Sequence, residues 1–257
     1  MKLSKLVFII STFLLSFSLY GIDLPLHASA SQNATSGLIF LSSSPSACFI
    51  NPAFSANSAL EVGTCYLFNV KELPFYSFHA TKRSNNIGVY LGSTFLEHPD
   101  FRETTTNISL NYNKSILSYG AALRLVHRDI TEIKNETIIN ADSGAIYRNG
   151  MISLSLAACN IMTYESLSFL GELNVRLSEK GSISLGFEKE PDFDFTLKLG
   201  SNYQLHEILT ILCSYQHSPE RIGSGVIIHL TRMNISYSVL THQYLDLTHF
   251  ISICYEL

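Results

Sequence analysis

The chain has few charged residues, no tryptophan and only one long apolar run. Asp, Glu, Lys and Arg make up 15% of its 257 residues, against roughly 25% in soluble domains, and its mean hydropathy is +0.19. After Leu19 no run approaches the ~20 apolar residues that a membrane-spanning helix needs. A chain this apolar can still cross a membrane, because a closed β-barrel also satisfies every backbone hydrogen bond in lipid.

The net charge of −4 comes without a basic patch, which argues against nucleic acid as a partner. The cysteines are odd in number and widely spaced, unlike the dense even set of a disulfide scaffold or the close pairs of a zinc site. We interpret them as small apolar packing residues and leave one chance disulfide open. They are Cys48, Cys65, Cys159, Cys213 and Cys254.

No motif for catalysis or metal binding stands out. The histidines are scattered, and only His242 and His249 could approach each other, across the last predicted hairpin. Gly223, Ser224 and Gly225 lack the spacing of a nucleophile elbow. We therefore expect no metal, no cofactor and no enzyme activity, although a catalytic set on a barrel rim would not be visible in the sequence.

The beginning of the chain has the pattern of an export signal. Lys2 and Lys5 precede an apolar run at residues 6–19, which is short for a membrane anchor. We assign residues 1–21 to a signal peptide. Gly21 ends the apolar region, but Ala28, Ser29 and Ala30 carry the better small-x-small pattern, so the cut could fall as late as residue 30.

From Leu60 to the C-terminus, apolar and polar residues alternate between short turns. The clearest example is residues 233–239, where every odd position is apolar and every even position is polar. This period of two places one polar and one apolar face on each strand. Turn signals lie at residues 84–86, 98–100, 148–150, 179–181, 190–192 and 218–220. The pattern predicts about fourteen strands, one of which would include residues 193–199.

Alternation alone fits both a membrane barrel and a secreted soluble β-sandwich that binds a ligand. Low charge, the export signal and an apolar-faced strand at residues 250–257 favour an all-β antiparallel barrel in the outer membrane of a diderm bacterium. The partners would then be outer-membrane lipid and the barrel assembly machinery. Without tryptophan, an interfacial aromatic girdle would need tyrosine, although cross-strand packing explains these residues equally well. The candidates are Tyr66, Tyr76, Tyr90, Tyr112, Tyr119, Tyr203, Tyr215, Tyr237 and Tyr255.

Two stretches resemble the FadL and PorV/PorQ families of outer-membrane proteins. The first leads from Ser36 to Asn51, Pro52 and Ala53, similar to the motif that precedes the first barrel strand in those families. The second is the closing hairpin, with Tyr237, His242, Thr248 and His249. A weaker likeness lies at residues 142–148.

The resemblance implies a fourteen-stranded barrel at residues 60–257 with residues 22–59 as an N-terminal hatch inside the lumen. It further implies a transport or secretion-associated channel for hydrophobic solutes or exported proteins. Short predicted connections leave little room for a large external pocket.

Three charged residues stand between apolar neighbours in predicted strands, Arg124, Arg176 and Lys198, and a fourth, Glu188, follows apolar Phe187. On the lipid face an Arg at mid-bilayer would cost about 2–4 kcal/mol. We therefore expect these side chains to line the lumen, as ion pairs around the hatch or, less simply, along a permeation path.

Overall fold

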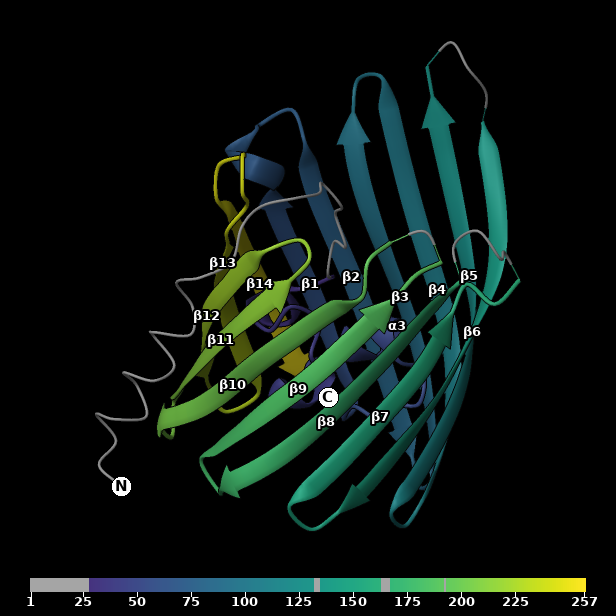
Figure 1. Ribbon diagram of the computed structural model, residues 1–257. Coiled ribbons are helices and arrows are strands. Elements are labelled where there is room, and N and C mark those ends of the chain that lie inside the picture. The colour runs from purple at the N-terminus through teal and green to yellow at the C-terminus, as the bar shows by residue number, and fades with distance from the viewer. Residues whose placement is uncertain (1–27, 132–134, 163–166, 192) are drawn as a thin grey trace.

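The computed structural model describes residues 28–131, 135–162, 167–191 and 193–257. Fourteen antiparallel strands form a closed barrel in which each strand pairs with its sequence neighbours and β1 pairs with β14 (Figure 1). The predicted number of strands is confirmed. The β-sandwich alternative is wrong, because pairing of the first strand with the last leaves one continuous sheet. The predicted signal peptide lies outside the described residues.

The strands alternate in direction around the ring. They are β1 (Ala59–Tyr66), β2 (Pro74–Ser84), β3 (Ile87–His98), β4 (Phe101–Lys114), β5 (Leu117–Ile130), β6 (Glu136–Asn149), β7 (Ile152–Cys159), β8 (Ser168–Ser178), β9 (Gly181–Lys189), β10 (Thr196–His206), β11 (Leu209–His217), β12 (Arg221–His229), β13 (Met233–Leu240) and β14 (Thr248–Glu256).

The two ends of the barrel are built differently. At one end, here called the turn end, tight connections join the strands at residues 85–86, 115–116, 150–151, 179–180, 207–208 and 230–232. The C-terminus also lies there, where Leu257 N donates to Ser58 O at 2.9 Å. At the opposite, loop end, residues 67–73 and 241–247 are the longest fully described connections. Strands β3 to β6 rise above their neighbours at the loop end (Figure 1), and we call this part the tall wall.

Side chains alternate between the lumen and the outer surface as the sequence predicts. In β1, for example, Ala59, Glu61 and Cys65 are buried and face inward, while Leu60 and Val62 are exposed and face outward. Two residues that are paired in register on neighbouring strands point to the same side of the sheet. The alternation between inward and outward side chains therefore extends around the ring.

The strand predicted at residues 193–199 is partly wrong. β10 begins only at Thr196, which pairs with Glu188 near the end of β9. Phe193 and Phe195 continue the alternation, but the ladder with β9 begins only at Thr196 and includes neither of them. Phe195 instead stacks on Phe187, with ring centroids 5.5 Å apart.

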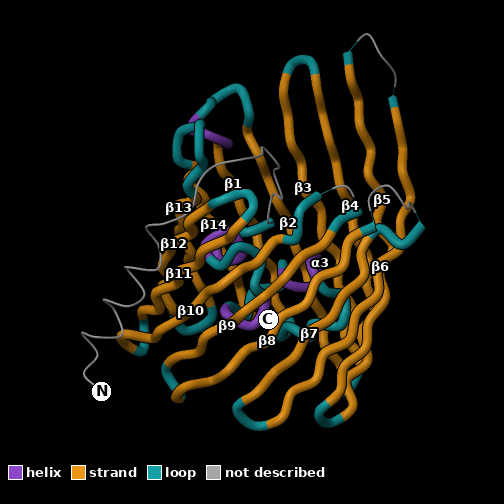
Figure 2. Tube along the Cα trace, viewed as in Figure 1, coloured by secondary structure: helices purple, strands orange, loops and turns teal. Residues whose placement is uncertain are grey.

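Residues 28–58 lie inside the ring of strands and contain three short helical turns (Figure 2). These are α2 (Ala30–Ala34), η1 (Ile39–Leu41) and α3 (Ala47–Ile50), and every residue from 28 to 39 is buried. We call residues 28–58 the N-terminal segment. No helix in the described part of the chain is long and apolar enough to cross a membrane.

Candidate functional site: the lumen and the N-terminal segment

The motif Asn51, Pro52 and Ala53 lies buried against the lumen wall. Asn51 Nδ2 donates to Ser155 Oγ at 2.7 Å and to Leu156 O at 3.1 Å, both on β7. Its Oδ1 accepts from Ala53 N at 2.9 Å, which fixes the turn that follows α3. The asparagine therefore joins the N-terminal segment to the barrel.

Glycines on the inward face make room for this segment. A Cβ at Gly144 would overlap the Asn51 side chain, and one at Gly120 would overlap the Pro52 carbonyl. The same holds where Leu38 meets Gly186 on β9 and Gly200 on β10, and where residues 33–34 meet Gly223 and Gly225 on β12. A glycine inside a strand often marks a close approach of backbone. Six lumen glycines thus match the path of the N-terminal segment.

The segment carries no Asp, Glu, Lys or Arg, whereas charged residues of the wall hold its backbone. Glu172 on β8 accepts Ile39 N at 2.7 Å and Phe40 N at 3.3 Å, at the start of η1. Glu61 on β1 accepts Ser46 N at 3.2 Å and the Ser44 hydroxyl at 2.5 Å, just before α3. Each carboxylate satisfies backbone donors that a helical turn leaves free.

Glu61 and Glu172 are lumen residues that were not predicted from the sequence. Both stand in alternating stretches, and both occupy the inward position of their strands. The apolar neighbours that pointed to Arg124 also surround Glu61, which stands between Leu60 and Val62. What the sequence could not supply is the partner, because the segment's path through the lumen is a tertiary feature.

Arg124 on β5 lies on the lumen side of the wall. Its Nη2 lies 2.8 Å from Asp142 Oδ2 on β6 and donates to Phe49 O at 3.0 Å, at the end of α3. The guanidinium also lies over the Phe49 ring, 4.8 Å from its centroid. Asp142 in turn accepts Asn160 N at 2.8 Å. The ion pair therefore joins the segment to two strands and a loop.

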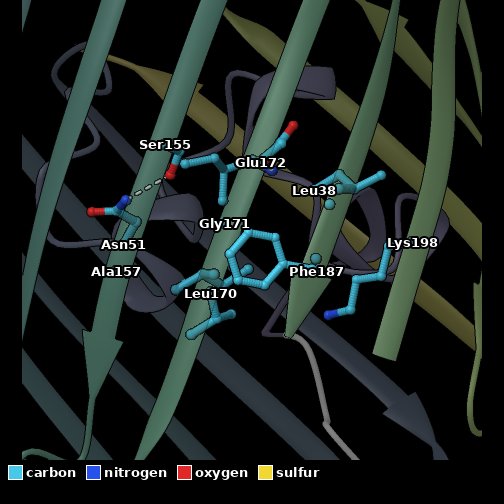
Figure 3. Close-up of a pocket in the computed structure, with 13 residues that line it drawn as sticks. Leu38, Asn51, Ser155, Ala157, Leu170, Gly171, Glu172, Phe187 and Lys198 are labelled. Atoms are coloured by element: carbon cyan, nitrogen blue, oxygen red, sulfur yellow. Dashed lines mark hydrogen bonds between the residues drawn. The ribbon is translucent and has the colours of Figure 1, made fainter. Parts of the chain in front are cut away.

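Lys198 on β10 and Glu188 on β9 form a second lumen ion pair, with Nζ and Oε2 2.7 Å apart. Lys198 borders a cavity of about 20 Å³ between the segment and β7 to β10 (Figure 3), room for about one water. A second cavity, of about 30 Å³, is lined by Glu61 and segment serines. Arg176 is in register with inward Ser182 but exposed near the turn end of β8, away from both ion pairs.

A buried histidine holds the first described residue of the segment. His79 Nε2 lies 3.1 Å from Ala28 O, and Nδ1 lies 2.7 Å from the Tyr90 hydroxyl. Tyr90 is completely buried, so of the two alternatives for this tyrosine the surface girdle is excluded and packing within the barrel remains. It faces the lumen because β3 pairs with β2 in the register that aligns Tyr90 with Thr81.

The four residues of the closing-hairpin motif lie on β13, on β14 and in the loop between them, beside the seam where β14 meets β1. Thr248 Oγ1 accepts Phe68 N at 2.9 Å and lies 3.0 Å from His242 Nε2, and the Phe68 ring meets His242 edge-on at 4.6 Å. On the outer face, Tyr237 Oη and His249 Nδ1 are 2.7 Å apart. The motif thus fastens the first loop to the last, and we call the contacts among Phe68, His242 and Thr248 the seam latch.

The two histidines of the motif do not meet. His242 lies in the loop at residues 241–247, where burial and the charge of Arg221 lower its pKa to about 4. His249 belongs to the Tyr237 pair on the other face. Within the described residues, no group of three or more His, Cys, Asp or Glu side chains is arranged to hold a metal ion.

The outer surface is an apolar band bordered by tyrosines. Exposed aliphatic residues that form it include Val62, Leu91, Ile108, Leu123, Leu156, Leu173, Leu185, Leu199, Ile211 and Ile251. Exposed Tyr112, Tyr119, Tyr203 and Tyr255 lie toward the turn end, and Tyr66 and Tyr76 toward the loop end.

All five cysteines are free, and Cys213 is exposed on this outer surface, so the interpretation of Cys213 as a packing residue was wrong. It faces outward because it alternates with inward Leu212 and Ser214.

The tall wall has the reverse polarity. Its outward positions at the loop end are polar apart from exposed Phe95, and they include Glu97, Arg102, Thr104, His127 and Asp129. Its inward positions include half-buried Leu96, Phe101, Val126, Ile130 and Ile138, beside the ion pair of Arg128 and Glu103 at 2.7 Å. The apolar band therefore ends below the tall wall, and an apolar inner surface stands above the N-terminal segment.

Comparison with known proteins gives structural likenesses only. No protein-family model matches the chain, and no curated protein matches it. Among solved structures, a Rh. blastica porin with five substitutions matches this chain with a TM-score of 0.48 at 10% sequence identity. The match covers 78% of this chain and 99% of the porin. A triple mutant of the Rhodopseudomonas blastica porin has a TM-score of 0.47 at 11% identity over the same shares. These likenesses say nothing about what this chain transports or binds.

Proposed function

We propose that the protein is an outer-membrane channel of a diderm bacterium whose lumen is closed at rest by the N-terminal segment acting as a hatch. The observation that carries this proposal is the inverted polarity of a closed barrel, with an apolar outer surface and a polar lumen filled by an uncharged segment of its own chain. A water-soluble barrel would expose polar residues instead.

The outer surface supports the membrane assignment. An apolar band with tyrosines at both borders is the pattern of a transmembrane barrel. The turn end, with its tight connections, would face the periplasm, and the tall wall would project outside the cell. The C-terminal strand β14 would be recognised by the barrel assembly machinery.

The chemistry of the lumen supports a hatch that moves. The covered wall is rich in hydroxyl and amide groups, among them Ser109, Asn111, Ser184, Ser214 and Gln216. A wall of this kind is readily solvated when the segment leaves. The segment is short and uncharged, and it is held by hydrogen bonds to the wall together with an apolar cluster in which Ile39 and Phe54 join Tyr90 and Ile146 of the wall.

The inner surface of the tall wall supports a hydrophobic solute or an exported polypeptide as the cargo. Phe101, Ile130 and Ile138 offer apolar contact outside the band, above the hatch. A solute that rests there would still have to displace polar hatch contacts to pass. The proposed channel would therefore resemble the FadL and PorV proteins in its general plan, with a smaller external surface.

The membrane assignment is tested in isolated outer membranes. We expect the protein to be extracted only by detergent and to change its electrophoretic mobility on heating, as closed barrels do. Recovery in the periplasm or medium would overturn it. The hatch is tested separately in liposomes, where deletion of residues 31–56 is expected to raise conductance.

A reversible lock makes the hatch test sharper. Ser36 Oγ on the segment and Ser214 Oγ on β11 are 2.8 Å apart, so the double variant Ser36→Cys/Ser214→Cys should form a disulfide. Ser29 Oγ and Ser46 Oγ, both within the segment, are 2.7 Å apart, and Ser29→Cys/Ser46→Cys is the matched control. We expect reducing agent to raise conductance only in the first variant, and equal conductance before and after reduction would contradict hatch movement.

A further inference from the structure

We infer that the mature chain keeps Ala28, Ser29 and Ala30, so that the export signal is cut upstream of Ala28 and not after the small-x-small triplet that these residues form. This inference rests on the exported, hatch-closed barrel proposed above. In sequence, the triplet is the better cut site. In the structure, its three residues are almost completely buried in the lumen.

Ala28 is bound to the wall. Its carbonyl oxygen lies 3.1 Å from His79 Nε2, and the His79 ring also bonds the Tyr90 hydroxyl through Nδ1. With Nε2–H donating to Ala28, the Tyr90 hydroxyl donates to Nδ1, so both ring nitrogens are satisfied. Without Ala28, His79 would keep a buried donor without its acceptor.

Ser29 organises the start of the segment. Its Oγ caps α2 by accepting Gln32 N at 3.4 Å, and its carbonyl accepts Asn33 N at 3.0 Å and Asn33 Nδ2 at 2.7 Å. Its Oγ also lies 2.7 Å from Ser46 Oγ, next to the Glu61 contact. Because α2 has only five residues, a cut after Ala30 would remove the cap and the first helical residue together.

A cut after Ala30 would also create a charged α-amino group on Ser31. That residue is 2% exposed, and a buried charge is strongly unfavourable unless it is paired. Gly21, which ends the apolar run, provides a small residue upstream. A cut there leaves the whole of residues 28–58 available to fill the lumen.

Intact mass and N-terminal sequencing of the protein from outer membranes test the inference. We expect the first residue to lie between positions 22 and 28. Ser31 as the first residue would overturn the position of the cut, and Met1 would overturn processing itself. The proposed channel is judged independently, because liposome conductance can fail while the first residue lies upstream of Ala28.

A second measurement asks whether the three residues matter. Replacing residues 1–27 or residues 1–30 by a foreign signal peptide with a defined cut site gives mature chains that begin at Ala28 or at Ser31. Both should show heat-dependent mobility, because the barrel strands are unchanged. We expect thermolysin to cut around Leu38 at least tenfold faster in the chain that begins at Ser31. Equal rates would show that the contacts of residues 28–30 do not hold the segment, contrary to the inference.

Discussion

The outer and inner faces of the same strands follow different rules. On β4, Ile108 and Leu110 face outward, 55% and 59% exposed, while Asn107 and Ser109 face inward, 0% and 1% exposed. In the proposed membrane location the outer side chains need only be apolar, because a lipid surface has no fixed shape. The inner side chains meet one particular segment, so their size and hydrogen bonding are specified residue by residue. The outer face should therefore respond to charge and the inner face to shape.

A charge at the middle of the outer face should have the largest effect. Ile108 lies in register with Leu91 and Leu123, within the apolar band. Ile108→Arg should lower the free energy of unfolding in lipid vesicles by about 2–4 kcal/mol, the cost of an Arg at the bilayer midplane. Urea titration in vesicles measures it. Thr104→Arg is the matched control, on the same strand and face but on the tall wall, and an equal loss there would contradict the position of the band.

Loss of one inner carboxylate should release the segment without unfolding the barrel. Glu172→Ala leaves Ile39 N and Phe40 N without their acceptor, at about 1–3 kcal/mol for each buried donor. We expect higher conductance in liposomes and unchanged heat-dependent mobility. Glu97→Ala, an exposed outward carboxylate on β3, should change neither. If Glu172→Ala conducts like the unaltered protein, Glu172 does not hold the hatch.

The contrast between the faces also explains what the sequence could predict. A period of two is a local signal, so the fourteen strands and the inward positions of Arg124, Glu188 and Lys198 follow from it. The ends of β10 depend on where β9 stops, which alternation does not report. The partners of Glu61 and Glu172 depend on a path through the lumen that no local pattern encodes. The inward glycines were the available signal for a close backbone approach.

A small increase in size on the inner face should disturb the segment. The Cβ of Gly120→Ala would overlap the Pro52 backbone, which cannot rotate away as a side chain could. Overpacking of this kind costs about 1–3 kcal/mol. We expect faster hydrogen exchange at residues 51–54 with little change in the strands. Ala121→Val enlarges the next residue on the exposed outer face of β5 and should leave the exchange unaltered, so a similar effect from both variants would argue against the distinction between faces.

The seam latch should give the smallest effect, because two of its three residues, Phe68 and His242, lie in loops beyond the strands. The pKa of His242, lowered to about 4 mainly by burial, is below the ordinary value of about 6.5. The latch is therefore at full strength above pH 6.5, weakens as the pH falls toward 4, and changes little below that. Protection of the Phe68 backbone amide against hydrogen exchange, corrected for the intrinsic exchange rates, should show the same dependence on pH. His242→Gln keeps an acceptor for the Thr248 hydroxyl without a titrating group, so protection that still falls between pH 6.5 and 4 in this variant would assign the effect to another residue.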